Sequence, residues 1–280
     1  MLKPIRLNAS NVAALINKNP YVKRSDAILT AWRSSDKQSY EKAHARNETQ
    51  TVEDRRREIQ AATPFIVSNL TGRNTSVMDV VDSGGIKELQ RQNLHTDAAE
   101  EARRLMFTKY GEARERSIID RVRDILPEYD FQTNGKMYRK TIGKTRSGRD
   151  IVLQGKIDGL SQDGTTILEA KTRMHRLFLK LREYEHVQTR CYLELIPDAT
   201  KALLVEAHFE TSTPNVNIIE ISKTEPPLDA GDFLVTLQFA GELIGHIIDD
   251  PSIQDGFIRS KQKDQYIKRL AGDLLEGMVF

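Results

Sequence analysis

The sequence predicts an α/β (α+β) protein with a central mixed β-sheet flanked by helices. Three observations lead to this fold class. Segments with helical apolar spacing occur near both ends of the chain, β-branched segments occupy its middle, and another helical segment separates those strands. At 280 residues the chain is long enough for a sizeable core, and we expect a single domain over 1–280.

The composition excludes several classes of protein. A net charge of +2 beside 29% charged residues means dense but mixed charge, which does not by itself require a polyanionic partner. The single cysteine, Cys191, excludes a disulfide framework, a cysteine-rich zinc module and a four-cysteine iron–sulfur cluster. Its apolar surroundings (VQTRCYLEL) predict a buried thiol. No apolar run reaches membrane-spanning length and MLKPIRLNAS lacks a secretory core, so we expect a soluble intracellular protein without a membrane partner.

The first hundred residues divide into a periodic part and a polar part. Asn8 or Ser10 is a plausible N-cap for a helix over NVAALINK, which Asn19-Pro20-Tyr21 breaks before a second helix with Ile28, Leu29 and Trp32 on one side. From 34 to about 101 the apolar stripe is weak. We expect this segment to be a largely helical insertion of exposed, partly mobile helices.

The remaining chain alternates between helices and strands. One long helix or two successive helices are expected over 98–126, ended by Pro127. A strand near Phe131 and a basic loop or hairpin over 136–149 follow. Further helices are predicted at 178–195, 233–248 and 265–275, and further strands at 202–209 and 216–221. The apolar stripe of the helix at 233–248 predicts core or subunit packing.

A hairpin with a charged end is predicted in the middle of the chain. Residues 151–158 and 165–170 are rich in β-branched residues, and SQDG at 161–164 is a turn sequence. Strand alternation places Glu169 and Lys171 on one face with Ile167, and Leu168 and Ala170 on the other. A neighbouring strand that ends in Asp158 can bring a second carboxylate to the same place. Two carboxylates beside an ammonium group suggest a divalent-metal site for phosphodiester hydrolysis, and oxygen ligands favour Mg²⁺ or Mn²⁺ over zinc.

This pattern is weak alone, but two further segments strengthen it. Glu115 shares a predicted helix face with Gly111, Ile118 and Ile119, and a carboxylate on an apolar face needs a partner such as a metal. Glu112 is the competing choice. Downstream, Gln188 and Tyr192 lie one helical turn apart, on a face that can pack across the hairpin.

These residues together resemble a known family. G-x(3)-E, I-D-G, E-A-K and Q-x(3)-Y, in this order, resemble the PD-(D/E)XK nuclease superfamily, and Q-x(3)-Y resembles its RecB-like branch. The segment LNASNVAALINKNPYVKRSDAILTAW is similar to the opening of YqaJ-type viral recombinases, the phage lambda exonuclease-like family. The resemblance covers 3–33 and roughly 105–222, and it implies a restriction-endonuclease-like catalytic core over 105–222. It covers neither 34–101 nor the C-terminal tail, and Ile157 stands where a proline is common.

The resemblance also implies roles for individual residues. Asp158 and Glu169 would bind one or two Mg²⁺ or Mn²⁺ ions, with the Ala170 carbonyl completing the shell and Glu115 as an additional acid. Lys171 would orient the attacking water and stabilise charge in the transition state. Gln188 would hold the lysine or the scissile phosphate, with Tyr192 packed behind it. Ser10 matches a position near the 5′-terminal phosphate.

Basic residues on both sides of the hairpin predict a DNA contact, because cations attract the polyanion that the carboxylates would repel. A solvated basic loop is the alternative for the first cluster. We expect His175 and His186 to face solvent or to pack against helices rather than to act as bases. The predicted DNA-binding side chains are Lys136, Arg139, Lys140, Lys144 and Arg146 before the hairpin, where Arg149 adds to the basic cluster, and Arg173 and Arg176 after it, with Lys180 and Arg182 nearby.

The resemblance therefore implies a Mg²⁺-dependent 5′–3′ exonuclease that acts on double-stranded DNA ends in recombination or repair. It also implies a viral or phage origin, a single-strand annealing protein as partner, and a ring-shaped oligomer such as a trimer unless the insertion blocks it. Two alternatives stay open. One is a structure-specific endonuclease or an RNase of the same fold. The other is a non-catalytic DNA-binding protein, against which the intact Asp158, Glu169 and Lys171 argue.

Overall fold

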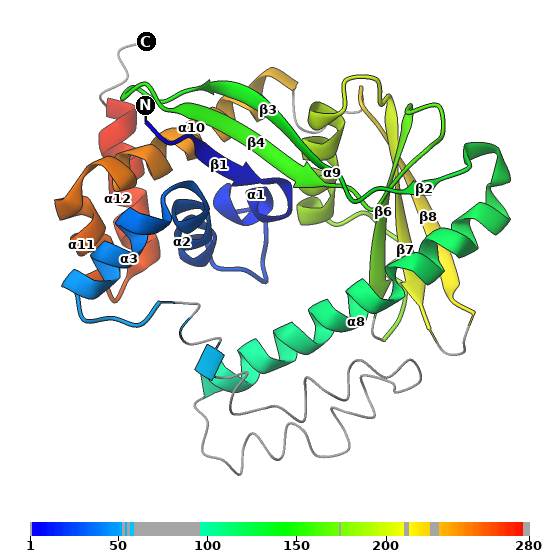
Figure 1. Ribbon diagram of the computed structural model, residues 1–280, viewed down its shortest axis with the longest axis horizontal. Helices are drawn as coiled ribbons and strands as arrows, with labels where there is room; N and C mark the ends of the chain where they lie inside the picture. Colours follow the sequence, from blue (N-terminus) through cyan, green and yellow to red (C-terminus); the bar gives the residue numbers. More distant parts are fainter. Residues whose placement is uncertain are drawn as a thin grey trace.

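The computed structural model confirms a mixed α/β architecture flanked by helices, but its strands form two mixed sheets instead of the one central sheet that the sequence predicted (Figure 1). It describes residues 2–51, 54, 57, 58, 96–173, 175–209, 213–224 and 230–276. The predicted insertion over 34–101 falls mostly outside these residues. Within the described chain, no helix has the length and apolar character needed to cross a membrane.

The first sheet contains three strands in the order β1-β4-β3. β4 (Asp150–Lys156) is central, with β1 (Ile5–Asn8) parallel on one side and β3 (Met137–Lys144) antiparallel on the other. β1 was not expected from the sequence. It is short, and its two inward side chains, Ile5 and Leu7, are fully buried by pairing with β4 far along the chain.

The second sheet has the order β2-β5-β6-β7-β8. β6 (Thr166–Arg173) and β7 (Lys201–His208) are parallel neighbours, joined through helix α9 (Glu183–Leu195) as such a crossover requires. β8 (Asn215–Ser222) pairs antiparallel with β7 and forms one edge. The remaining strands are the two-residue segments β2 (Gln132–Thr133) and β5 (Gly159–Leu160).

The prediction of a single hairpin over 151–170 is wrong. β4 and β6 belong to different sheets, and from the segment before the turn only Gly159 and Leu160 of β5 pair with β6, opposite Leu168 and Ile167. The chain leaves the first sheet after Lys156 and enters the second at Gly159. Alternation within each strand gave the correct faces, but it carries no information on which strands pair.

The helices mostly follow the expected spacing. α1 (Ala9–Leu15) begins after Asn8 and α2 (Arg24–Ser35) follows the Asn-Pro-Tyr break, with α3 (Lys37–Arg46) after it. α8 (Thr96–Ile125) is one continuous helix, and a single 3₁₀ turn, Pro127–Tyr129, follows it. The C-terminal helices are α10 (Ala230–Asp249), α11 (Pro251–Arg259) and α12 (Lys263–Glu276).

Two helix predictions need correction. α9 begins five residues later than expected, at Glu183, because Leu179 adopts a left-handed backbone (φ 57°) that interrupts a helix. α11 was not predicted, although its start carries a clear signal: the Asp250 carboxylate accepts hydrogen bonds from the backbone N–H groups of Ser252 and Ile253, with Pro251 as the first helical residue.

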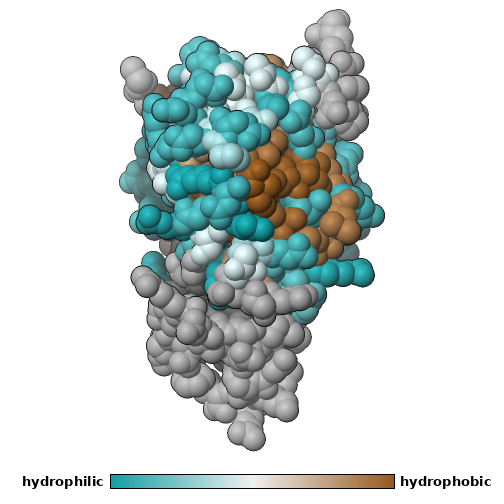
Figure 2. Space-filling view, turned by 90° about the vertical axis from the view of Figure 1, so that its right-hand side faces the viewer, coloured by the Kyte–Doolittle hydropathy of each residue, from teal (hydrophilic) through white to brown (hydrophobic). Residues whose placement is uncertain are grey.

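Two hydrophobic cores meet at β6. The larger core lies among the first sheet, α1, α2, α9 and the C-terminal helices, and it includes Ile167 and the buried thiol of Cys191. It also contains the stripe of α10, so this stripe is core rather than a subunit contact. The smaller core lies between α8 and the second sheet and includes Leu168, with Ala170 packed against it. Figure 2 views the molecule from the side of the second sheet, where apolar side chains gather inside a hydrophilic rim.

Candidate metal and catalytic site

Glu169 and Lys171 form the centre of the candidate site. They lie two residues apart on the face of β6 that α9 covers, and Lys171 Nζ donates a hydrogen bond to Glu169 Oε1 at 2.7 Å. The Glu169 side chain is 4% exposed and that of Lys171 is 22% exposed, so the carboxylate is buried and the lysine is partly accessible. The two residues therefore form a fixed, largely buried ion pair.

Gln188 and Tyr192, on α9, hold this pair from the opposite side. Gln188 Nε2 donates to Glu169 Oε1 at 2.7 Å, and Gln188 Oε1 accepts from Lys171 Nζ at 2.9 Å. Gln188 Nε2 also lies 2.8 Å from the hydroxyl oxygen of Tyr192, a residue that is only 3% exposed. The helical spacing of Gln188 and Tyr192 thus orients one amide against both charged groups, as the sequence predicted.

Asp158 lies in the segment that connects the two sheets. Its Oδ2 accepts a hydrogen bond from the backbone N–H of Ala170 at 2.8 Å, and its own carbonyl accepts from the N–H of Asn134 at 3.1 Å. The first of these bonds fixes the carboxylate beside β6 at the residue between Glu169 and Lys171. The structure therefore brings Asp158, Glu169 and Lys171 together, although β4 and β6 do not pair.

Both carboxyl groups have raised pKa values. Burial raises the pKa of Asp158 to about 6; the Ala170 N–H opposes this shift, and the Glu115 charge adds to it. Burial raises the pKa of Glu169 to about 8, against the attraction of Lys171 and with the help of Asp158. Burial acts to lower the pKa of Lys171, but the Glu169 carboxylate outweighs it and the net shift is upward. Burial is thus the largest cause of the raised pKa of both carboxyl groups, and it favours their neutral forms in the absence of a bound cation.

Glu115 approaches this site from α8. It is half-buried, and its neighbours Ile118 and Ile119 are fully buried, as the predicted apolar face requires. Burial raises the pKa of Glu115, the nearby Lys156 lowers it, and Glu169 and Glu112 raise it further. Glu115 is therefore close enough to Glu169 for their charges to interact.

The residues present fit one divalent cation better than a cluster. Glu169 Oε2 is buried and receives no hydrogen bond within the described chain, while Oε1 is occupied by Lys171 and Gln188. A buried carboxylate oxygen without a donor, beside a second carboxylate, suits a cation. Among the described residues, however, no three Asp, Glu, His or Cys side chains are arranged as ligands of one metal ion.

Gly155 gives the site its close packing. A Cβ atom at this position would lie 2.7 Å from Tyr192 Cε1 and 3.0 Å from Ala9 Cβ. The glycine therefore admits α9 and α1 against β4, and this approach of other elements is why the position is a glycine. Ser10 is exposed in the first turn of α1, next to Ala9.

The first predicted DNA-binding cluster is largely paired. Lys140 bonds Glu194 at 3.1 Å and Lys144 bonds Asp150 at 2.7 Å. Arg146 donates from its guanidinium to the carbonyl of Leu274. Lys136 lies over the Tyr138 ring and Arg139 donates to Gln154, contacts that leave their charge uncompensated.

Arg173 differs from its predicted role. It is 8% exposed, and its guanidinium contacts Glu185 at 2.7 Å and Glu206 at 2.6 Å, both of which are fully buried. Arg173 follows Lys171 on the same face of β6, so it neutralises carboxylates of α9 and β7 instead of facing solvent. Sequence reasoning missed Glu185 and Glu206; the only available signal was one acidic residue in each apolar segment, VEAH and EHV.

The two histidines and the basic residue Arg176 lie on α9 or in the loop that precedes it. His186 is buried on α9, and His175 is exposed in the loop that follows β6. Arg176 is exposed in the loop that follows β6.

Comparisons with known proteins give little similarity. No family model matches the chain, and no curated protein matches it. Among solved structures, one described as the crystal structure of SSO0001 is similar at a TM-score of 0.38 and 16% identity, over 69% of this chain and 86% of that chain. A similarity at this level establishes neither a shared fold nor a shared function.

Proposed function

We propose that this protein is a divalent-metal-dependent nuclease with a PD-(D/E)XK, restriction-endonuclease-like core. The observation that carries the proposal is the state of Glu169: one carboxylate oxygen binds Lys171 and Gln188, and the other is buried without a donor beside Asp158. This arrangement places a buried carboxylate oxygen, which has no hydrogen-bond partner in the described part of the chain, in the same side chain that fixes the Lys171 ammonium group.

Asp158 and Glu169 would hold Mg²⁺ or Mn²⁺, with Glu115 near enough to compensate further positive charge. The bound ion would supply Lewis-acid activation of water and charge stabilisation at the leaving oxygen. Lys171, held in place by Glu169 and Gln188, would orient water against the phosphate and stabilise negative charge on its oxygens. Gln188 positions the ammonium group, and Tyr192 in turn fixes Gln188.

The arrangement of the second sheet supports the core assignment. β6 carries Glu169 and Lys171 and pairs parallel with β7, and helices α9 and α8 cover its two faces. We propose further that the enzyme is a 5′–3′ exonuclease on double-stranded DNA ends, similar to YqaJ-type viral recombinases. This finer assignment, with an annealing partner and a ring-shaped trimer, rests on the sequence resemblance alone, chiefly that of the N-terminal segment LNASNVAALINKNPYVKRSDAILTAW.

The test compares four substrates in the presence of Mg²⁺: linear duplex labelled at the 5′ end, the same duplex labelled at the 3′ end, a covalently closed circle, and single-stranded RNA. An exonuclease of this polarity releases the 5′ label first and leaves the circle intact. Cutting of the circle indicates an endonuclease, and cutting of RNA alone indicates an RNase. If no substrate is cleaved with Mg²⁺ or Mn²⁺, the catalytic function is wrong and a binding role replaces it.

A further inference from the structure

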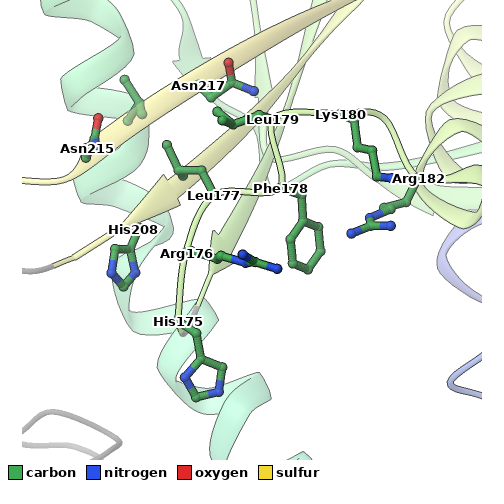
Figure 3. A pocket seen from close by; sticks show the side chains of 11 residues that line it. His175, Arg176, Leu177, Phe178, Leu179, Lys180, Arg182, His208, Asn215 and Asn217 are labelled. Atoms are coloured by element: carbon green, nitrogen blue, oxygen red, sulfur yellow. The ribbon is translucent and has the colours of Figure 1, made fainter.

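A basic pocket lies beyond the candidate site, at the ends of β6 and β7 and the start of β8. Its volume is about 780 Å³, within the range of sites that hold small organic ligands. The loop 175–182, which joins β6 to α9, forms one wall, and Asn215, Val216 and Asn217 of β8 belong to the other (Figure 3). Among the described residues that line it, none is acidic.

The cations of this pocket are not neutralised. Arg176 and Lys180 are exposed, and no ion pair involves either of them within the described part of the chain. The guanidinium of Arg182 lies over the Phe178 ring at 4.5 Å, a contact that orients the group but keeps its charge. In Figure 3 the charged ends of these three side chains lie around Phe178. The pocket therefore presents a concentrated positive charge to a ligand.

The pocket is built before any ligand arrives. The buried Glu206 carboxylate accepts from the backbone N–H of Leu179 at 2.9 Å and from Asn217 Nδ2 at 3.2 Å, while it also binds Arg173. The Arg173 guanidinium lies 4.1 Å from the centre of the Phe178 ring. One carboxylate thus ties the loop, β8 and the end of β6 into a single frame.

This frame also connects the pocket to the Glu169–Lys171 pair. Lys171 and Arg173 lie on the same face of β6, two residues or roughly 7 Å apart along the strand. The residues of α9 that face this strand are also neighbours: Glu185 contacts Arg173, and Gln188, about one helical turn later, contacts Lys171. A chain of linked nucleotides at Lys171 would reach the pocket within a short distance.

We propose that this pocket binds a nucleoside monophosphate unit, either within a nucleic acid strand or as a released mononucleotide. Arg176 and Lys180 would bind the phosphate, and Asn215 would contact the nucleoside across the pocket from them. The proposal rests on the proposed nuclease function for the origin of its ligand. A phosphate alone would leave most of the volume empty, whereas cations on one wall and amides on the other suit both parts of a nucleotide.

Binding is measured in EDTA, so that no cleavage occurs and the result does not depend on catalysis. The probes are thymidine 5′-monophosphate by calorimetry and a fluorescent five-nucleotide thymidine strand by anisotropy, with inorganic phosphate for comparison. Whichever of these probes binds the wild-type protein, the double substitution Arg176→Gln/Lys180→Gln should weaken its affinity by at least about tenfold. For the strand, it should also lower the slope of log affinity against log salt by about 1.4.

The matched control is Lys261→Gln/Lys268→Gln, which removes the same charge from exposed positions beside and within α12, at the opposite end of the molecule from β8 (Figure 1). It should leave both affinities within about twofold. Asn215→Ala should weaken the nucleotide but not inorganic phosphate. Circular dichroism confirms that each variant is folded.

The outcomes are separable from those of the nuclease assay. Binding of the strand alone identifies a substrate subsite, and binding of the mononucleotide identifies a product site; both support the pocket. If neither probe binds, if the pocket variant binds as tightly as wild type, or if inorganic phosphate binds as tightly as the nucleotide, the proposal is overturned. A protein that binds nucleotides here but cleaves no substrate would retain the pocket and lose the nuclease function.

Discussion

Lys171 and Glu169 face the same side of β6 and form an ion pair of 2.7 Å, and the second oxygen of the carboxylate has no donor in the described part of the chain. Lys171 thus binds Oε1 of Glu169, while Oε2 of the same carboxylate is available to bind a cation. Because the two residues are in direct contact, substitution of one also changes the surroundings of the other.

Lys171→Ala should reduce nucleic acid cleavage by at least about 100-fold, because one charge contact to the transition state is removed. Single-turnover cleavage of linear duplex measures the effect. Lys201→Ala is the matched control, since Lys201 also pairs with a glutamate, Glu220, at 2.9 Å on the same sheet but at the other end of the strands. Equal rates for Lys171→Ala and wild type would contradict the proposed role.

Mg²⁺ should stabilise the wild-type protein against heat, because the ion binds the folded state and relieves repulsion between the carboxylates. At an ion concentration 100 times the dissociation constant, the gain is about 2.7 kcal/mol. Asp158→Asn and Glu169→Gln should each abolish most of this gain. Scanning calorimetry with and without EDTA measures it, and a thermal midpoint that Mg²⁺ leaves unchanged would exclude metal binding at this site.

The metal-free protein should lose stability as pH rises from about 4 to about 6. Burial raises the pKa of Asp158 from 3.8 to about 6, so the folded state binds more protons than the unfolded state in this interval, and the free energy of unfolding falls with pH. The fall amounts to at most about 3 kcal/mol. Glu169, with a pKa of about 8, acts in the same direction up to that pH.

Urea denaturation at several pH values in EDTA measures this slope, and Asp158→Asn should flatten it between pH 4 and 6. Asp163→Asn is the control, because hydrogen bonds from Ser161 and Thr165 lower the pKa of that exposed aspartate. Its stabilising effect is present above its ordinary pKa and is lost as pH falls, so its removal should not flatten the slope. A stability that rises with pH in the Asp158 interval would refute the burial argument.

Gly155→Ala should destabilise the protein by about 1–3 kcal/mol, because the new methyl group would lie 2.7 Å from Tyr192. Displacement of Tyr192 would also disturb Gln188 and lower cleavage. Gly111→Ala serves as the matched control: nothing lies within 4 Å of its added Cβ, and alanine favours the helix by about 0.5–1 kcal/mol. Opposite signs of the two changes in denaturation midpoint are expected.

Arg173→Gln should destabilise the fold by about 3–5 kcal/mol, since two buried carboxylates lose their cation. Arg176→Gln, at an exposed position of the adjoining loop, should change stability by less than about 0.5 kcal/mol. Chemical denaturation of the two variants measures the difference. If Arg173→Gln and Arg176→Gln are equally stable, Arg173 does not neutralise the buried carboxylates, and the predicted solvent-facing role applies.

Local patterns predicted most elements and much of the site. Alternation placed Glu169 and Lys171 opposite Leu168 and Ala170, and helical spacing placed Gln188 beside Tyr192, because both are properties of single elements. The pairing of β1 with β4 depends on residues about 146 positions apart, for example Ile5 with Ile151, and no local signal contains it.

The lack of a local signal for strand pairing also explains why the role predicted for Arg173 differs from the one observed. Whether an arginine faces solvent or a carboxylate depends on what other strands place next to it. Arg173 meets Glu206 only because β6 and β7 are parallel neighbours in a fixed register, with Lys171 opposite Glu206. Arg176, three residues later, lies beyond the strand and remains exposed.

The passage of the chain from one sheet to the other at Ile157 and Asp158 constrains how this protein can be rearranged. A circular permutant opened within the turn at 161–164 keeps Asp158 joined to the first sheet, and its bond to the Ala170 N–H can re-form when β5 docks on β6. A permutant opened between Lys156 and Asp158 frees the carboxylate from the strand that carries it. The permutant opened at the turn should therefore fold and retain the site, whereas the permutant opened between the two sheets should not, although only a few residues separate the two points.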